Sequence, residues 1–144
     1  LRVYDQRVSN IQVITKFAPD LPETMADYFQ LQQVFLNIVI NAEYFMTEAH
    51  HGGILTITTE KVGDIIEVSF TDDGPGIAKE NLVRLFDPFF TTKKIGKGTG
   101  LGLSISHGMI TEHGGRIYAE SELGKGATFI VELPIVIGDN EGGN

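Results

Sequence analysis

The strongest constraint on the fold is a pair of strand-like runs joined by a short turn, which occurs twice in the chain. Residues 54–61 (ILTITTEK) and 65–73 (IIEVSFTDD) are rich in β-branched residues and lie on either side of a turn that contains Gly63. Residues 116–121 (RIYAES) and 127–134 (ATFIVELP) lie on either side of a second glycine-containing turn. Both arrangements are typical of β-hairpins. The chain is therefore expected to build a sheet in which antiparallel pairing dominates.

The remaining segments predict helices and one further strand. Apolar residues recur at helical spacing over residues 28–49, and Gly52 and Gly53 end the pattern. Residues 79–86 predict a short helix and residues 101–113 a longer one, whereas residues 10–18 (NIQVITKFA) predict a strand. Alternating blocks of this kind indicate an α+β fold. We expect a two-layer sandwich, with a mixed sheet of about five strands covered on one face by about three helices.

Composition narrows the class of protein. The chain has 144 residues, 42% of them hydrophobic, which suits one domain at residues 1–135, followed by a flexible polar tail at residues 136–144. It begins with Leu1 and not Met, so we expect it to be part of a longer protein. The absence of cysteine excludes disulfides and thiolate metal sites. A net charge of −8 argues against nucleic acid as a partner, because that contact needs a basic face. We expect a cytoplasmic domain without membrane contact, because no apolar run is long enough to span a bilayer, and a monomer when the domain is isolated.

Two polar elements interrupt the apolar helix and the first hairpin. Asn37 and Asn41 are one helical turn apart and share a face of the predicted helix. Each could be satisfied by a backbone group, but two on one face are more typical of a site, and an amide oxygen is a suitable Mg²⁺ ligand. Asp72 begins the sequence DDGPGI at a strand end, where the glycines let backbone approach a ligand closely. The alternative is an ordinary Asp-Gly turn.

The segment KKIGKGTGLGL (residues 93–103) concentrates lysines and glycines in an acidic chain. Glycines at the start of a helix let backbone N–H groups face an anion, and lysines add positive charge for phosphate. The segment follows Phe86, Phe89 and Phe90, which would form part of the core or anchor a mobile loop. A loop of this composition could also be flexible without a catalytic role. Because no strand precedes the segment, it is neither a Walker A loop nor a dinucleotide-binding fingerprint.

In this order, the motifs resemble the ATP-binding catalytic domain of sensor histidine kinases, a Bergerat ATP-binding fold shared with gyrase, MutL-type repair proteins and the ATP-dependent heat-shock chaperone. LQQVFLNIVINAEYFM (residues 31–46) is similar to the N box, and DDGPGI (72–77) to the G1 box. FDPFFTTK (86–93) is similar to the F box, and GKGTGLGL (96–103) to the G2 box. GKGATF (124–129) is similar to the glycine turn before the last strand. The resemblance covers nearly the whole chain.

This resemblance implies a site for ATP and Mg²⁺. Asn41 would hold the metal, Asp72 would accept a hydrogen bond from the adenine amino group, and Lys93 and Lys97 would contact the γ-phosphate. Residues 87–99 would form a mobile lid, with the three phenylalanines as its hinge packing. The implied catalytic residues are Asn37, Asn41, Lys93 and Lys97. The implied cofactor-binding residues are Asn37, Asn41, Phe45, Asp72, Gly74, Gly76, Ile77, Phe86, Thr92, Lys93, Gly98, Thr99, Gly100, Leu101, Gly102, Leu103 and Thr128.

The implied function is transfer of the γ-phosphoryl group of ATP to a histidine on a separate, dimerising helical hairpin of the same parent chain. A response regulator receiver domain would be a further partner. None of the four histidines of the chain lies in a phosphoacceptor setting, so each is expected to be a surface or capping residue; they are His50, His51, His107 and His113. The acceptor is therefore expected outside this sequence.

Two other functions remain open, an ATPase of the same superfamily and a nucleotide-binding pseudokinase that only docks partners. A superfamily ATPase would activate water with a Glu one turn before the metal-binding Asn. Asn37, a poor base, occupies that position and favours the kinase. The intact N, G1 and G2 boxes argue against a pseudokinase. Two residues depart from the family: Phe45 replaces a frequent Tyr, and Tyr44 replaces the Lys or Arg of some subfamilies.

Overall fold

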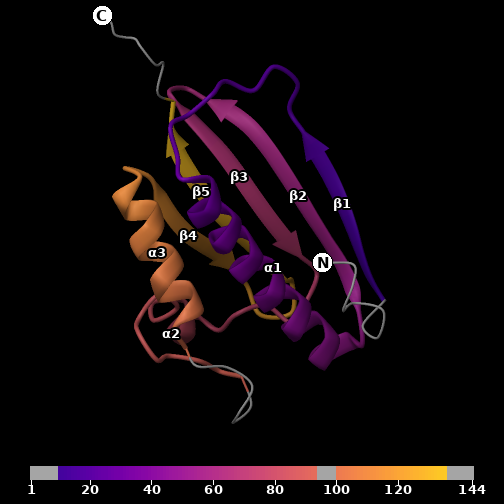
Figure 1. Cartoon of the computed structure of the whole chain (residues 1–144). Helices are drawn as coiled ribbons and strands as arrows, with labels where there is room; N and C mark the ends of the chain where they lie inside the picture. Colours follow the sequence, from indigo (N-terminus) through magenta and orange to yellow (C-terminus); the bar gives the residue numbers. More distant parts are fainter. Residues whose placement is uncertain (1–9, 94–99, 136–144) are drawn as a thin grey trace, which may run out of the picture.

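Residues 10–93 and 100–135, which the computed structural model describes, form a five-stranded sheet with three helices on one face (Figure 1). The strand order is β1-β2-β3-β5-β4. The strands are β1 (Ile11–Phe17), β2 (Gly53–Val62), β3 (Ile65–Asp72), β4 (Arg116–Ser121) and β5 (Ala127–Pro134), and the helices are α1 (Tyr28–His50), α2 (Lys79–Leu82) and α3 (Gly102–Glu112). The predicted α+β sandwich is confirmed. The predicted tail, residues 136–144, lies outside the described residues.

The sheet is mixed because its first strand differs from the others. β2 pairs antiparallel with β3, and β4 with β5, as the two hairpin patterns predict. β3 and β5 also pair antiparallel, with Asp72 opposite Ala127, so one strand of each hairpin lies at the centre of the sheet. β1 pairs parallel with β2 because the chain returns to the sheet through α1.

Caps at both ends set the limits of α1. The Asp27 side chain precedes the helix and accepts a hydrogen bond from the N–H of Gln30 at 3.0 Å. At the other end, His51 adopts the left-handed conformation with φ 60°, and its N–H bonds to the carbonyl of Thr47. The helix therefore ends at His50, one residue beyond the predicted limit, and His51, which precedes Gly52 and Gly53, takes the left-handed position.

The core lies between α1, α3 and the sheet. On α1, four of the five buried side chains recur every four residues, which places them on the face turned to the sheet. They are Val34, Ile38, Ala42 and Met46, and they pack with Val68, Phe70, Phe129 and Val131 of the central strands. Each larger apolar side chain buried here contributes about 1.5–3 kcal/mol to stability. None of the helices in the described part of the chain has the length and hydropathy of a membrane span.

The helix predicted at residues 79–86 is shorter in the structure. α2 ends at Leu82, and the chain continues in tighter turns in which the Arg84 N–H bonds to the Asn81 carbonyl at 3.0 Å. Pro88 follows, and proline cannot donate the backbone hydrogen bond that a continuing helix requires. The turns bring Leu85 beside Asn81 at the cavity described below.

Two histidines make packing contacts between elements. The Asp27 N–H donates to Nε2 of His113 at 2.9 Å, and Nδ1 of His113 lies 2.7 Å from the Met109 carbonyl oxygen. This arrangement requires the neutral ring with its hydrogen on Nδ1. It ties the C-terminal end of α3 to the N-terminal cap of α1. The ring of His107 packs against Phe86, with the ring centroids 5.5 Å apart.

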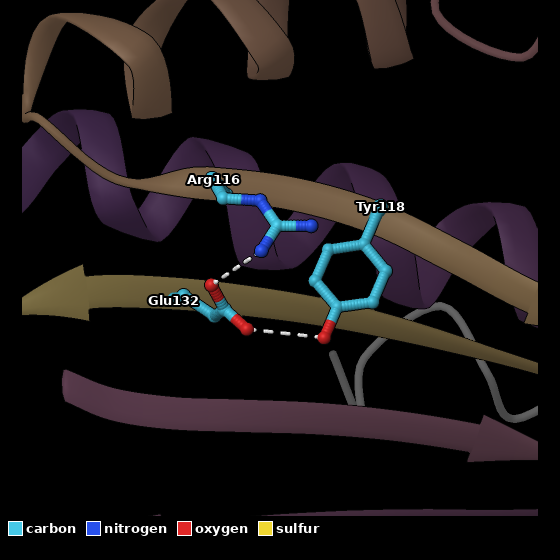
Figure 2. A network of polar contacts seen from close by, with 3 residues as sticks. All are labelled: Arg116, Tyr118 and Glu132. Atoms are coloured by element: carbon cyan, nitrogen blue, oxygen red, sulfur yellow. Dashed lines mark hydrogen bonds and ion pairs between the residues drawn. The ribbon is translucent and has the colours of Figure 1, made fainter. Parts of the chain in front are cut away.

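The sheet face turned away from α1 carries a cross-strand polar network (Figure 2). The Tyr118 hydroxyl donates to Oε2 of Glu132 at 3.0 Å, and Nη1 of Arg116 donates to Oε1 at 3.3 Å. Desolvation, followed by the hydrogen bond and charge of Glu132, raises the pKa of Tyr118. Thr128 lies on the same face, because it comes four positions before Glu132 in β5 and side chains two or four positions apart point to the same side of a sheet. Its hydroxyl lies 3.1 Å from that of Thr71.

Candidate functional site

A cavity of about 370 Å³ opens between α1, the loop after β3 and the start of α3. This volume falls within the range of about 300–1,000 Å³ that is typical of small-molecule sites. Eleven of the residues that line it are among those predicted from the motifs. They are Asn37, Asn41, Phe45, Asp72, Gly76, Ile77, Thr92, Lys93, Gly100, Gly102 and Leu103.

Asp72 provides a buried carboxylate in this cavity. It ends β3 with 9% of its surface exposed, and its Oδ1 accepts a hydrogen bond from the N–H of Gly74 at 2.9 Å. Burial raises the pKa of Asp72, the backbone hydrogen bonds from Gly74 and Ala127 oppose this effect, and the charge of Asp73 adds to it. Asp73, which had no predicted role, accepts a hydrogen bond from the Ile54 N–H at 2.9 Å. The two acidic residues therefore have different roles: Asp72 lines the cavity, and Asp73 holds the start of β2.

The loop after β3 is fixed by a close backbone approach and one serine. Gly76 has φ 79°, and a Cβ there would overlap the carbonyl oxygen of Glu122. The Ile77 N–H donates to Oγ of Ser121 at 2.8 Å, and the same hydroxyl donates to the Gly126 carbonyl at 2.7 Å. Ser121 thereby connects this loop to the turn between β4 and β5. The sequence has no spacing signal that identifies Ser121.

The two asparagines of α1 have different surroundings. Nδ2 of Asn37 donates to the Gly102 carbonyl at 3.1 Å and to Oγ of Ser106 at 3.0 Å, while its Oδ1 accepts from Gln33 at 2.8 Å. Asn37 therefore ties α1 to the first turn of α3. Asn41 lines the cavity, and its side chain makes no hydrogen bond within residues 10–93 and 100–135. Its amide oxygen is available to a ligand.

Lys93 brings a positive charge to the cavity. Its Nζ lies 5.1 Å from the centroid of the Tyr44 ring, and burial lowers its pKa. The Tyr44 ring packs edge-on against Phe45, with centroids 5.0 Å apart and planes at 89°. Lys97, Gly98 and Thr99, the other predicted site residues of this segment, lie outside the described residues.

The three phenylalanines predicted as one hinge cluster separate in the structure. Phe86 packs against the core, Phe90 lines the cavity under the Arg84 guanidinium at 4.5 Å, and Phe89 is 73% exposed. The Phe89 N–H donates to the Gly100 carbonyl at 2.8 Å. Gly100 has φ 77°, and a Cβ there would overlap the backbone of Phe89. This contact closes the base of the segment predicted as a lid, which is described only as far as Lys93.

Four predicted cofactor-binding residues do not line the cavity. Phe86 packs in the core, Leu101 precedes α3, and Thr128 lies on the opposite face of the sheet. Gly74 lies next to the carboxylate of Asp72, because a Cβ at this position would be 3.0 Å from Oδ1 of Asp72. Several residues that the motifs do not single out do line the cavity; among them are Ile40, Asn81, Leu85, Leu123, Ala127 and Phe129.

The comparisons with known proteins agree on one family. The family model "Histidine kinase-, DNA gyrase B-, and HSP90-like ATPase" matches residues 26–137. The chain is 38% identical to sensor histidine kinase ZraS of Escherichia coli (strain K12) over 139 residues, which cover 95% of this chain and 29% of ZraS. The catalytic domain of histidine kinase ThkA has a TM-score of 0.76 and 36% identity, covering 93% of this chain and 86% of that one.

Two solved complexes also match. Full-length ShkA with AMPPNP has a TM-score of 0.80 and 29% identity, covering 95% of this chain and 28% of that one. ThkA with the response regulator protein TrrA has a TM-score of 0.73 and 31% identity, covering 94% and 38%. The chain belongs to the histidine kinase-, DNA gyrase B- and HSP90-like ATPase family. Within that family it corresponds to the catalytic domain of sensor histidine kinases, as the motifs predict.

The first prediction concerns the Asn37 bridge. Asn37→Asp removes the N–H donor and sets a carboxylate against the Gly102 carbonyl, so we expect the free energy of unfolding to fall by about 1–3 kcal/mol. Urea unfolding measures the loss. Asn41→Asp is the matched control on the same helix face, and we expect it to cost less than about 0.5 kcal/mol because no protein hydrogen bond is lost in the described part. Equal losses in the two variants would contradict the bridge.

The second prediction concerns Asp72 and pH. Because its folded-state pKa is raised above the ordinary value of 3.8, the native state binds more protons than the unfolded state in the weakly acidic range. The free energy of unfolding therefore contains a contribution that falls as pH rises through this range. Asp72→Asn removes that contribution. Urea unfolding at several pH values should show the variant gaining stability relative to the parent from about pH 3.5 to pH 7. A difference that is independent of pH would refute the burial argument.

Proposed function

We propose that this chain binds ATP with Mg²⁺ and catalyses transfer of the γ-phosphoryl group to a histidine on a helical hairpin of its parent protein. The observation that carries the proposal is one cavity that contains a buried carboxylate, an available amide oxygen and an ammonium group. These groups come from Asp72, Asn41 and Lys93. A purine amine, a divalent cation and a polyphosphate are the ligand groups that such a set would recognise.

The base would bind beside Asp72. Its carboxylate would accept a hydrogen bond from the adenine amino group, and Gly76 and Ile77 of the following loop line the same cavity. Guanine has no amino group at that ring position, so the site would favour adenine. Phe45, Leu103 and Phe129 supply apolar surface for the ring.

The metal and phosphates would bind near Asn41. Within the described residues, no cluster of acidic or histidine side chains could hold a metal by itself. An amide oxygen together with substrate phosphates is a common way to hold Mg²⁺, and Asn41 offers that oxygen. Bound Mg²⁺ would neutralise phosphate charge. Gly100 and Gly102 lie at the start of α3, where backbone N–H groups favour an anion, and Lys93 adds a positive charge.

Asn37 supports the kinase over the ATPase. It occupies the position at which a superfamily ATPase would carry its Glu base, and an amide cannot accept the proton of an attacking water. Its nitrogen is bonded to Gly102 and Ser106, so the role of this side chain is to hold α3 beside Asn41. Phosphoryl transfer requires mainly positioning and charge neutralisation, which this arrangement can supply. A pseudokinase would not need a complete set of such groups.

The partners of the parent protein are also part of the proposal. ThkA has been solved with the response regulator TrrA, and ShkA with AMPPNP. By analogy, we expect a receiver domain to take the phosphoryl group from the parent of this chain. The chain corresponds to 29% of the length of ZraS, so the hairpin and any sensing region would belong to the rest of the parent.

The third prediction tests binding by calorimetry. We expect the 144-residue chain to bind ATP in the presence of Mg²⁺ with a Kd between about 1 μM and 1 mM, which is about −8 to −4 kcal/mol. Asn41→Ala should weaken Mg²⁺-dependent binding about tenfold or more, because one metal ligand is lost. Thr128→Ala is the control, since that side chain lies on the opposite face of the sheet. Circular dichroism checks the fold, and an unchanged affinity in Asn41→Ala would remove Asn41 from the site.

The fourth prediction tests the reaction. With γ-labelled ATP, the chain alone should hydrolyse ATP very slowly and should not label itself. Addition of the parent's helical hairpin should give label on the hairpin that is lost in acid and stable in base, as expected of phosphohistidine. Rapid phosphate release by the chain alone would favour the ATPase function. Acid-stable label on Ser or Thr would instead indicate a serine kinase.

A further inference from the structure

The contact between Lys93 and Tyr44 is an unexpected feature of the cavity. Lys93 is the last residue of the segment FDPFFTTK (residues 86–93), and its ammonium lies 5.1 Å from the centroid of the Tyr44 ring. An ammonium at this distance from a ring face is attracted by the ring quadrupole. In the part of the chain that the structure describes, no carboxylate lies within ion-pair distance of this ammonium. The aromatic ring is thus the group that holds this partly buried charge.

The orientation of Tyr44 is itself fixed. Its ring packs edge-on against Phe45, which lines the cavity. Tyr44 also lies three residues after Asn41, so the two side chains are neighbours on the surface of α1. The helix that presents the proposed metal ligand therefore also presents the ring that holds Lys93.

The chemistry allows Lys93 to contact the ring and a phosphate at once. An ammonium has three N–H donors, and contact with a ring face does not use all of them. Burial also lowers the pKa of Lys93, which indicates that water has been partly removed from this group before any ligand binds. A lysine that is already placed and partly desolvated loses less freedom when it binds an anion.

We propose that Tyr44 is a positioning residue for Lys93, and that its ring holds the ammonium at the cavity ready for the terminal phosphate of a nucleoside triphosphate. The inference rests on the proposed function for the identity of the ligand. It assigns a role to a position where some subfamilies of the family carry a basic residue. In this chain the positive charge comes from Lys93, and the Tyr44 ring on α1 holds the Lys93 ammonium in place.

The experiment compares three variants of the 144-residue chain. Tyr44→Leu removes the ring, Tyr44→Phe keeps the ring and removes the hydroxyl, and Tyr28→Leu removes an exposed tyrosine from the same helix as a control. ATP and ADP affinities are measured by calorimetry, with circular dichroism as the check on folding. We expect Tyr44→Leu to weaken ATP about two- to tenfold and to weaken ADP less. Tyr44→Phe keeps the ring beside Lys93 and should lose less ATP affinity than Tyr44→Leu, and Tyr28→Leu should match the parent.

A second measurement needs no nucleotide. In the free chain, the ε-methylene protons of Lys93 should resonate upfield of those of an unfolded lysine, because they lie over the ring. Lys93→Arg identifies the signal. The shift should persist in Tyr44→Phe and vanish in Tyr44→Leu, which a merely structural role of Tyr44 would not require.

The outcomes separate the two proposals. An unshifted Lys93 signal in the parent, equal damage from Tyr44→Phe and Tyr44→Leu, or tighter ATP binding by Tyr44→Leu would each overturn the role of the ring. If the parent shows the shifted signal but binds no ATP, the proposed function fails, and the phosphate part of this inference fails with it. A shifted signal, with selective loss of ATP affinity in Tyr44→Leu, supports both.

Discussion

The arrangement of the site depends on the hydrogen bonds between Asn37 and the first turn of α3. One amide nitrogen bonds to the Gly102 carbonyl and to the Ser106 hydroxyl, and Ser106 is fully buried. The Ser106 hydroxyl also donates to the Gly102 carbonyl at 2.9 Å, so loss of the Asn37 amide removes two bonds from a part-buried network of three. Because α1 carries Asn41 and α3 begins with the glycines, this contact sets the distance between the proposed metal ligand and the proposed anion site.

The second organising feature is that the cavity partly removes two charged groups from water. Burial raises the pKa of Asp72 and lowers that of Lys93, so each group is shifted toward its neutral form. A ligand that donates to the carboxylate and brings negative charge to the ammonium would relieve both effects. Tyr44 stabilises the ammonium in the meantime, at the cost of a weaker interaction than an ion pair would give. The free protein is therefore organised for a ligand that both donates a hydrogen bond and carries negative charge, such as a nucleotide.

Much of the fold could be predicted because its patterns are local. The hairpin runs predict β2 to β5, and helical spacing predicts α1 and α3, since burial on one face imposes its period on the sequence. The motifs also predict eleven of the residues that line the cavity. The failures have local causes as well. α2 is short because of tighter turns before Pro88, and Phe86, Phe89 and Phe90 take three separate environments although they are close in the sequence.

The sequence by itself determined the family, the order of the elements and the types of side chain available to the site. Only the tertiary structure decided which of them meet. Thr128 and Ala127 are adjacent in the chain, yet only Ala127 lines the cavity, because successive strand residues point to opposite faces of the sheet. Asn37 and Ser106 are 69 residues apart, so no local sequence pattern could predict their hydrogen bond. Their contact exists because α1 and α3 pack side by side. The contact between Lys93 and Tyr44 has the same origin. Two strands, β2 and β3, lie between α1 and the segment that ends at Lys93, and tertiary packing brings the Lys93 ammonium to the Tyr44 ring.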